Sequence, residues 1–208
     1  MIFDMKTLPP SQRYKILSST VTPRPIAWVT TLSEEGTPNA SPFSFFNMVG
    51  NDPPLLVIGF LTNPLTGQIK DTPTNILATG EYVVNLVSES DAEAMNLTSI
   101  DAPPDINELD LASIETKPSL MVRPSRIASA PVSFECRKFA VHEWERQIVV
   151  LGEVVMAHVR DEFITDRERI RFDVPAMNLI GRVQGSDTYL RNSDQFNLKR
   201  PAYEHSQL

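Results

Sequence analysis

Residues 26–48 read IAWVTTLSEEGTPNASPFSFFNM, and this stretch decides the fold. Its first part, residues 26–32, is rich in β-branched and aromatic residues, which favour a strand. Residues 33–37 supply turn chemistry, and residues 38–48 return to strand character. The pattern therefore predicts an antiparallel hairpin.

The segments that follow alternate between strand and short helix. Residues 55–61 and 81–87 are apolar or β-branched runs, too short for most helices. Residues 131–144 and 147–159 are expected to pair as a long hairpin, with residues 148–155 buried on both faces. The remaining expected elements are helices at 8–18, 72–80 and 88–97, a helical turn at 167–172, and a last strand-like piece at 177–189.

Seventeen prolines against eight glycines predict many short elements separated by turns. Strands interrupted by short helices favour a closed antiparallel barrel, because closure removes exposed strand edges. The 208 residues fit one domain, 1–208, since domains usually contain about 100 to 200 residues. Within it we expect an irregular excursion at about 98–125 and a polar C-terminal tail from about 192.

Bulk composition excludes several classes of protein. Hydrophobic residues make up 41% and charged residues 22%, which argues against disorder. The net charge of −7 disfavours nucleic-acid binding, which draws its affinity from many cations. No apolar run approaches the ~18 residues of a membrane helix, and no signal pattern opens the chain, so we expect no membrane association and a cytoplasmic location. The single cysteine, Cys136, is expected to be a small buried hydrophobe.

Several chemical signatures are missing from the sequence. The three histidines lack the short spacings of zinc ligands, so no protein-held metal is expected. The chain has no GxGxxG after a strand, no GxxxxGK[ST] and no GxSxG. These absences argue against a Rossmann domain, a P-loop enzyme and a serine hydrolase.

Residues 22–25 (TPRP) hold Arg24 between two prolines, directly before the first strand. Pro25 biases the backbone of Arg24 toward extended geometry, so the cation leaves a stiff segment. Its guanidinium could clamp a phosphate or a carbonyl of a bound cofactor. The competing interpretation is an ordinary surface arginine in a turn.

Residues 39–47 (NASPFSFFN) mix small polar residues with aromatic ones on what we expect to be a single strand. Alternation places Phe43 and Phe45 on one face, and Ser44 and Phe46 on the other. The backbone of such a strand can bind the polar edge of an aromatic ring system, while aromatic side chains cover its faces. The competing interpretation is that the phenylalanines are core residues.

Residues 70–75 (KDTPTN) place a cation and a hydroxyl at the start of a short helix. Helix N-termini present unpaired N–H groups and a positive dipole end to anions. A terminal phosphate could therefore bind the Lys70 ammonium, the Thr72 hydroxyl and backbone N–H groups. The competing interpretation is an ordinary helix, capped by Thr72, with an exposed lysine.

In this order, the segments TPRPIAWVTT, NASPFSFFN, DPP, KDTPTNI and TGEYVVN resemble the flavin reductase-like, FMN-binding split-barrel family. SFEC, VVLGEVV and IGR followed by Tyr189 extend the resemblance over roughly residues 10–189. It implies an antiparallel split β-barrel of six-stranded Greek-key type, a homodimer, and FMN in a cleft to which both subunits contribute. The residues on the family's flavin-binding segments are Arg24, Asn39, Ala40, Ser41, Phe43, Ser44, Lys70, Thr72 and Asn75.

The resemblance also implies an activity, an NAD(P)H-dependent flavin reductase in which NADH or NADPH passes hydride to bound or exchangeable flavin. Flavin carries this chemistry, so no catalytic acid or base is assigned to the chain. A redox partner protein or a monooxygenase could take the electrons. Two alternatives remain open: a flavoredoxin-like electron carrier with tightly bound FMN, and a non-catalytic flavin-binding protein.

Overall fold

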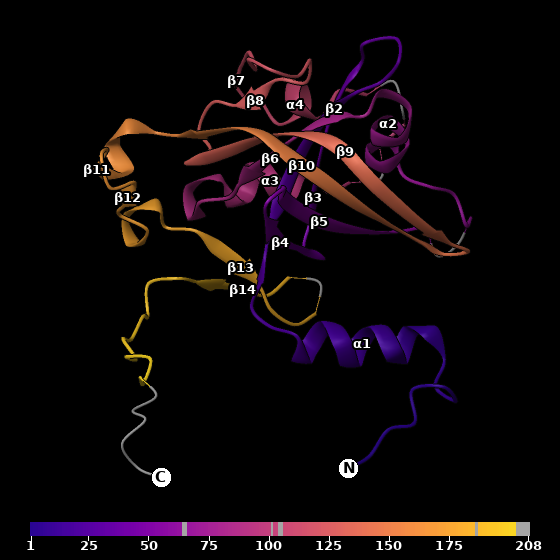
Figure 1. The fold of residues 1–208 in the computed structure, drawn as a ribbon. Coiled ribbons are helices and arrows are strands. Elements are labelled where there is room, and N and C mark those ends of the chain that lie inside the picture. Colours follow the sequence, from indigo (N-terminus) through magenta and orange to yellow (C-terminus); the bar gives the residue numbers. More distant parts are fainter. Residues whose placement is uncertain (64–65, 101, 104–105, 186, 203–208) are drawn as a thin grey trace.

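A computed structural model describes residues 1–63, 66–100, 102–103, 106–185 and 187–202. Its largest feature is an antiparallel sheet with the strand order β3-β2-β6-β9-β10-β5-β4 (Figure 1). The strands of this sheet are β2 (Ala27–Leu32), β3 (Pro38–Phe43), β4 (Phe46–Asn51), β5 (Pro54–Leu61), β6 (Glu81–Leu86), β9 (Val132–Trp144) and β10 (Gln147–Val159). The predicted hairpins β2–β3 and β9–β10 are both confirmed.

The two outer strands of this order, β3 and β4, are separated in the chain by only Ser44 and Phe45. A flat seven-stranded sheet would be roughly 29 Å wide at about 4.8 Å per strand, which two residues cannot span. The sheet therefore curls until its edges meet. At this seam, the Gly59 N–H donates to the Phe45 carbonyl at 2.7 Å. The Phe43 and Phe60 rings meet edge-on nearby, with centroids 4.7 Å apart.

The prediction of one strand over residues 38–48 is wrong, because the chain bends at Ser44 and Phe45. Because the bend divides the expected strand into β3 and β4, the sheet has seven strands and not the expected six. It changes the alternation of side chains, so Phe43 and Phe46 both pack in the barrel core. Phe45 instead lies against Tyr14, with ring centroids 6.1 Å apart. Barrel closure imposes this bend, and local strand preference carries no sign of it.

The barrel interior is the main hydrophobic core, and Cys136 lies fully buried within it as predicted. The prediction that residues 148–155 are buried on both faces is wrong. Ile148 and Val150 are buried, whereas Val149 and Leu151, which alternate with them, are only half-buried. This alternation is that of a strand with one face turned to the core.

Helices pack outside the barrel (Figure 1). They are α1 (Pro10–Thr20), α2 (Asp71–Thr79), α3 (Ala92–Leu97) and α4 (Glu108–Leu111), with the 3₁₀ turns η1 (Glu89–Asp91), η2 (Asp161–Phe163) and η3 (Pro175–Met177). A second apolar cluster joins Trp28 on β2, Met95 on α3 and Leu109 on α4. The Trp28 Nε1–H donates to the Thr98 hydroxyl at 2.9 Å, which satisfies its buried polar atom. This cluster fixes part of the predicted irregular excursion against the barrel.

Three small sheets complete the described part of the chain. Their strands are β1 (Arg24–Pro25) with β13 (Ile180–Arg182) and β14 (Tyr189–Arg191), β7 (Thr116–Lys117) with β8 (Arg126–Ile127), and β11 (Ile164–Asp166) with β12 (Arg171–Phe172). The predicted helical turn over 167–172 is wrong, because these residues form the tip and second strand of the β11–β12 hairpin. Ile170 has φ = 51° there, which a tight turn requires and an α-helix does not allow.

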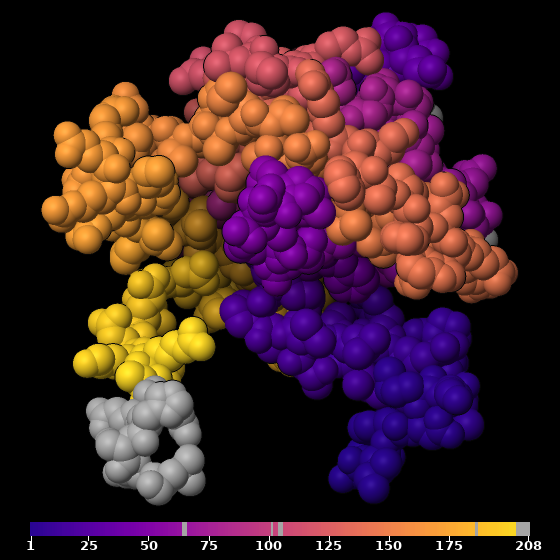
Figure 2. Space-filling model, in the orientation of Figure 1, coloured from indigo at the N-terminus to yellow at the C-terminus, as the bar shows by residue number. Residues whose placement is uncertain are grey.

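Helix α1 and the C-terminal segment project from the barrel body (Figure 2). Tyr14 and Leu17 on α1 are about half exposed, at 50% and 53%. Phe196 and Leu198 near the C-terminus are almost fully exposed. Within the ranges given above, no helix is long and apolar enough to cross a membrane.

Candidate functional site

The start of α2 meets strand β3, so two of the predicted binding segments come together. The Thr72 hydroxyl donates to Asn39 Oδ1 at 2.8 Å. The prediction that Thr72 caps α2 is wrong, because Lys70 occupies the N-cap position and no side chain caps this helix start. The helix ends as predicted at Gly80, whose φ of 74° needs a residue without a Cβ.

A buried polar network holds this junction. Asn39 Nδ2 donates to both carboxylate oxygens of Glu108, at 3.1 and 3.0 Å. The Ala40 N–H donates to the same carboxylate at 3.2 Å. Asn75 Nδ2 donates to the Thr31 hydroxyl at 3.0 Å, which anchors α2 to β2. The network therefore fixes the position of β3 relative to α2 and α4.

Glu108 is the residue of this network that sequence reasoning missed. Burial raises the pKa of its carboxyl group, although hydrogen bonds from its own backbone, from Ala40 and from Asn39 oppose that effect. An acidic residue in a four-residue helix inside an irregular segment is far more often a solvated surface group. Only the fold, which places α4 over β3, identifies it.

Arg24 is buried and donates hydrogen bonds to neighbouring segments of the chain, so its interpretation as an ordinary surface arginine is wrong. Its Nη1 donates to the carbonyls of Ser18 and Val21, its Nη2 to that of Val183 at 2.9 Å, and its Nε to the Ser44 hydroxyl at 3.3 Å. These bonds use four of the five N–H groups of the guanidinium. One N–H on Nη2 has no partner among the described residues.

The nine predicted site residues fall into two groups by exposure. The buried group consists of Arg24, Asn39, Ala40, Thr72 and Asn75. The half-buried group consists of Ser41, Phe43, Ser44 and Lys70. Phe43 packs against the barrel core, which confirms the core interpretation for that ring. Ser41, Ser44 and Lys70 are thus the half-buried polar side chains of the candidate site.

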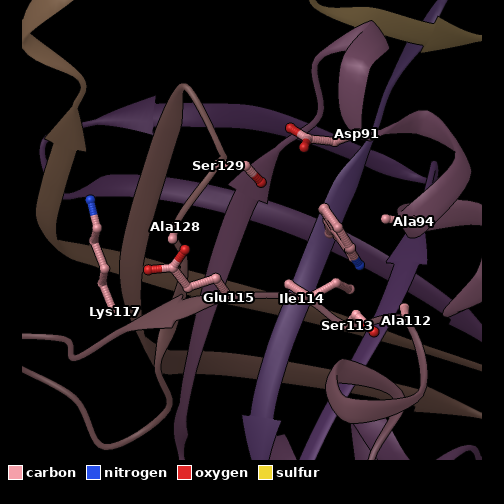
Figure 3. A pocket seen from close by; sticks show the side chains of 10 residues that line it. Asp91, Ala94, Ala112, Ser113, Ile114, Glu115, Lys117, Ala128 and Ser129 are labelled. Atoms are coloured by element: carbon pink, nitrogen blue, oxygen red, sulfur yellow. The ribbon is translucent and has the colours of Figure 1, made fainter.

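Two cavities lie elsewhere on the molecule, and none of the nine residues lines either of them. One, of about 380 Å³, lies beside Trp28, with Lys117 at one end of its lining and Asp91 and Ala94 at the other (Figure 3). The other, of about 750 Å³, lies between β8, β10 and the β11–β12 hairpin. The nine residues therefore lie outside both of these cavities.

Comparison with known proteins agrees with this architecture. A protein from Deinococcus radiodurans is 38% identical over 206 residues, which cover 97% of this chain and 90% of the relative. The 2-nitrobenzoate 2-nitroreductase NbaA of Pseudomonas fluorescens is 34% identical, with a TM-score of 0.87 and full coverage of both chains. Component B of nitrilotriacetate monooxygenase from Bacillus cereus is 28% identical, with a TM-score of 0.87 and coverage of 95% of this chain and 98% of that one.

The predicted fold class is confirmed. A structure from Shewanella frigidimarina described as having a split barrel domain has a TM-score of 0.80 at 20% identity, which is a likeness of fold, and covers 97% of this chain and all of that chain. The model of the family described as "Flavin reductase like domain" matches residues 18–172. This match includes both the β2–β3 hairpin and the start of α2. The chain belongs to the flavin reductase like domain family.

Proposed function

We propose that this protein is an FMN-dependent reductase that binds the FMN phosphate at the start of α2 and the flavin ring along residues 41–44. The observation that carries this proposal is the hydrogen bond between Thr72 and Asn39, because it brings the two segments to one place. Membership of the flavin reductase like domain family supports a flavin-related oxidoreductase function.

The start of α2 fits a phosphate group. No side chain caps this end of the helix, so the N–H groups of Asp71 and Thr72 can donate to an anion, whereas Pro73 has no N–H and that of Thr74 donates to the Lys70 carbonyl. Lys70 stands at the N-cap position and adds a cation. This local donor set explains how a chain with a net charge of −7 can hold a phosphate.

Residues 41–44 fit the polar edge of a flavin ring. Ser41 and Ser44 are half-buried and carry hydroxyls that can donate or accept. Arg24 fixes Ser44 through the Nε–H bond at 3.3 Å, so this hydroxyl is held in place before any ligand arrives. Bound FMN would supply two-electron transfer between a donor and an acceptor. The chain's own role is to position the ring and its partners.

A homodimer would complete the site. Ser41, Ser44 and Lys70 of the proposed site are only half-buried, so a second wall would be needed to close a cleft around FMN. Tyr14 and Leu17 on α1, and Met48 and Val49 on β4, expose large apolar side chains, and Tyr14 lies against Phe45, next to residues 41–44. Apolar surface of this kind suits an interface between two copies.

NADH or NADPH is the proposed electron donor. The nitroreductase relative favours a nitro-substituted acceptor, whereas the monooxygenase component favours release of reduced flavin to a partner enzyme. Anaerobic mixing of FMN-loaded protein with NADH or NADPH tests the reductase proposal. Loss of the visible flavin absorption supports it. If neither donor reduces the flavin, the reductase proposal is contradicted and an electron carrier or binding protein is favoured.

A further inference from the structure

Glu135 on β9 is a fully buried carboxylate that holds both a loop and a histidine. It accepts the backbone N–H groups of Leu120 at 2.8 Å, Met121 at 2.6 Å and Val122 at 3.2 Å. It also lies 2.6 Å from His158 Nε2 on β10. Burial alone would raise the pKa of Glu135, but these hydrogen bonds outweigh it and lower that pKa. The carboxylate is therefore ionised near neutral pH.

An ionised carboxylate only accepts hydrogen bonds, so His158 Nε2 must be the donor. The second ring nitrogen, Nδ1, has no hydrogen-bond partner among the described residues. The His158 side chain is 19% exposed and lines the larger cavity, of about 750 Å³. Because Nε2 is held by Glu135, the imidazole ring is fixed in place, and its Nδ1 can bind a group of a ligand.

This cavity, which we call the histidine cavity, has an excess of positive charge. Two of its acidic residues, Glu162 and Asp161, are paired with arginines, Arg160 and Arg167, each at 2.9 Å. The third, Asp166, lies near Arg169 and accepts its backbone N–H. Lys117 and Arg126, by contrast, have no carboxylate partner within the described ranges.

Lys117 and Arg126 are also directly opposite each other in the β7–β8 ladder. Like charges at opposed positions of paired strands destabilise the pair. An anion bound between them would relieve this repulsion. The opposed pair therefore offers two cations to one anionic group.

Part of the remaining wall is apolar, although polar and charged groups make up most of the lining. Ile127, Ile164 and Phe172 contribute to the apolar part, together with several alanines. The volume of about 750 Å³ lies within the roughly 300 to 1,000 Å³ typical of small-molecule sites. Apolar residues beside two cations match a compact organic acid better than they match an inorganic ion.

We propose that the histidine cavity binds a small organic acid, with its carboxylate at Lys117 and Arg126 and its apolar body against the adjoining apolar residues, next to the His158 ring. This site is separate from the proposed flavin site. Helix α2 and the β11–β12 hairpin lie on opposite sides of the molecule (Figure 1).

Benzoate is a suitable probe, followed by calorimetry and by NMR of the His158 ring in the full-length protein. Saturable binding with a shift of the His158 signals is expected. The Lys117→Ala/Arg126→Gln double variant should weaken it about tenfold or more. Arg169→Gln is the control, because Arg169 lies in the β11–β12 hairpin beside the cavity but does not line the cavity. The control should bind benzoate as the wild type does.

None of these variants replaces His158. A substitution of His158 would also disturb Glu135 and the loop at Leu120 that Glu135 holds. Absence of saturable benzoate binding would overturn the proposal, as would equal binding by the double variant. Phosphate binding as tight as benzoate binding would also contradict it, because the apolar wall would then have no role. FMN affinity should be unchanged in all variants, so the result does not depend on the proposed flavin site.

Discussion

Glu108 on α4 and Asn39 on β3 are joined through both carboxylate oxygens, 3.1 and 3.0 Å from a single amide nitrogen. Asn39 is in turn hydrogen-bonded to Thr72 on α2. Three elements distant in sequence are thus held by one buried side chain. These hydrogen bonds set the position of β3 relative to α2, and the geometry of the proposed flavin site depends on that relative position.

Glu108→Gln should destabilise the protein and weaken FMN binding. The amide oxygen at the Oε2 position can still accept from Asn39 and Ala40, but the amide NH2 then takes the Oε1 position and faces the Asn39 Nδ2 donor, so a buried N–H group is left unpaired. The expected loss is about 1–3 kcal/mol in the free energy of unfolding, measured by urea denaturation. Asp110→Asn, an exposed change in the same helix, should change stability by less than about 0.5 kcal/mol. Equal effects of the two substitutions would contradict the role of Glu108.

The two buried glutamates should have opposite pH dependences. Because the folded-state pKa of Glu108 is raised, its contribution to stability falls as pH rises from the ordinary glutamate pKa through that higher value. Because the folded-state pKa of Glu135 is lowered, its contribution is present above the ordinary glutamate pKa and is lost as pH falls through the lower value. Unfolding free energies of the wild type, Glu108→Gln and Glu135→Gln across acidic pH would check this. Two difference curves of the same slope would contradict it.

Gly152 on β10 provides the space that Tyr82 on β6 occupies. A Cβ at position 152 would lie 1.7 Å from the Tyr82 hydroxyl oxygen, and this oxygen is buried without a hydrogen-bond partner in the described chain. Gly152→Ala should therefore cost about 1–3 kcal/mol or more by overpacking. Tyr82→Phe should be close to neutral, because it removes an unsatisfied hydroxyl. In the double variant, Tyr82→Phe should recover part of the loss. A Gly152→Ala protein with wild-type stability in urea would contradict the predicted overpacking against Tyr82.

The proposed dimer predicts that a charge on α1 lowers the self-association of the protein. Leu17→Glu should shift the protein from dimer toward monomer in sedimentation or light scattering, and should weaken FMN binding with it. Leu111→Glu is the matched control, since Leu111 on α4 is similarly exposed, at 49% against 53%. A monomeric wild-type protein that still binds FMN tightly would contradict the two-subunit cleft.

The strands and their pairing were largely predictable from sequence, and the residue contacts within the site were not. Alternating β-branched residues predicted the β2–β3 and β9–β10 hairpins, because that signal is local. The bend at Ser44 and Phe45 arises from barrel closure, which no local pattern encodes. Arg24 was predicted to bind a ligand, yet four of its N–H groups bind protein atoms from three parts of the chain.

The buried carboxylates illustrate the same limit. Glu108 and Glu135 lie in segments whose sequence does not distinguish them from the other acids of the chain. Their role follows from the N–H groups that the fold gathers round them, at Ala40 for one and at Leu120 to Val122 for the other. Sequence predicted where a binding site could form, and the tertiary structure decided which of the predicted residues are buried and which are half-exposed.

The measurement that tests the central proposal most directly compares FMN with riboflavin on the Lys70→Ala variant. Only FMN carries the phosphate, so the variant should lose about tenfold or more in affinity for FMN and little for riboflavin, with Lys15→Ala on α1 as the matched control. Flavin fluorescence quenching gives both affinities in one titration. Equal weakening of both ligands, or no weakening of either, would contradict a phosphate site at the start of α2.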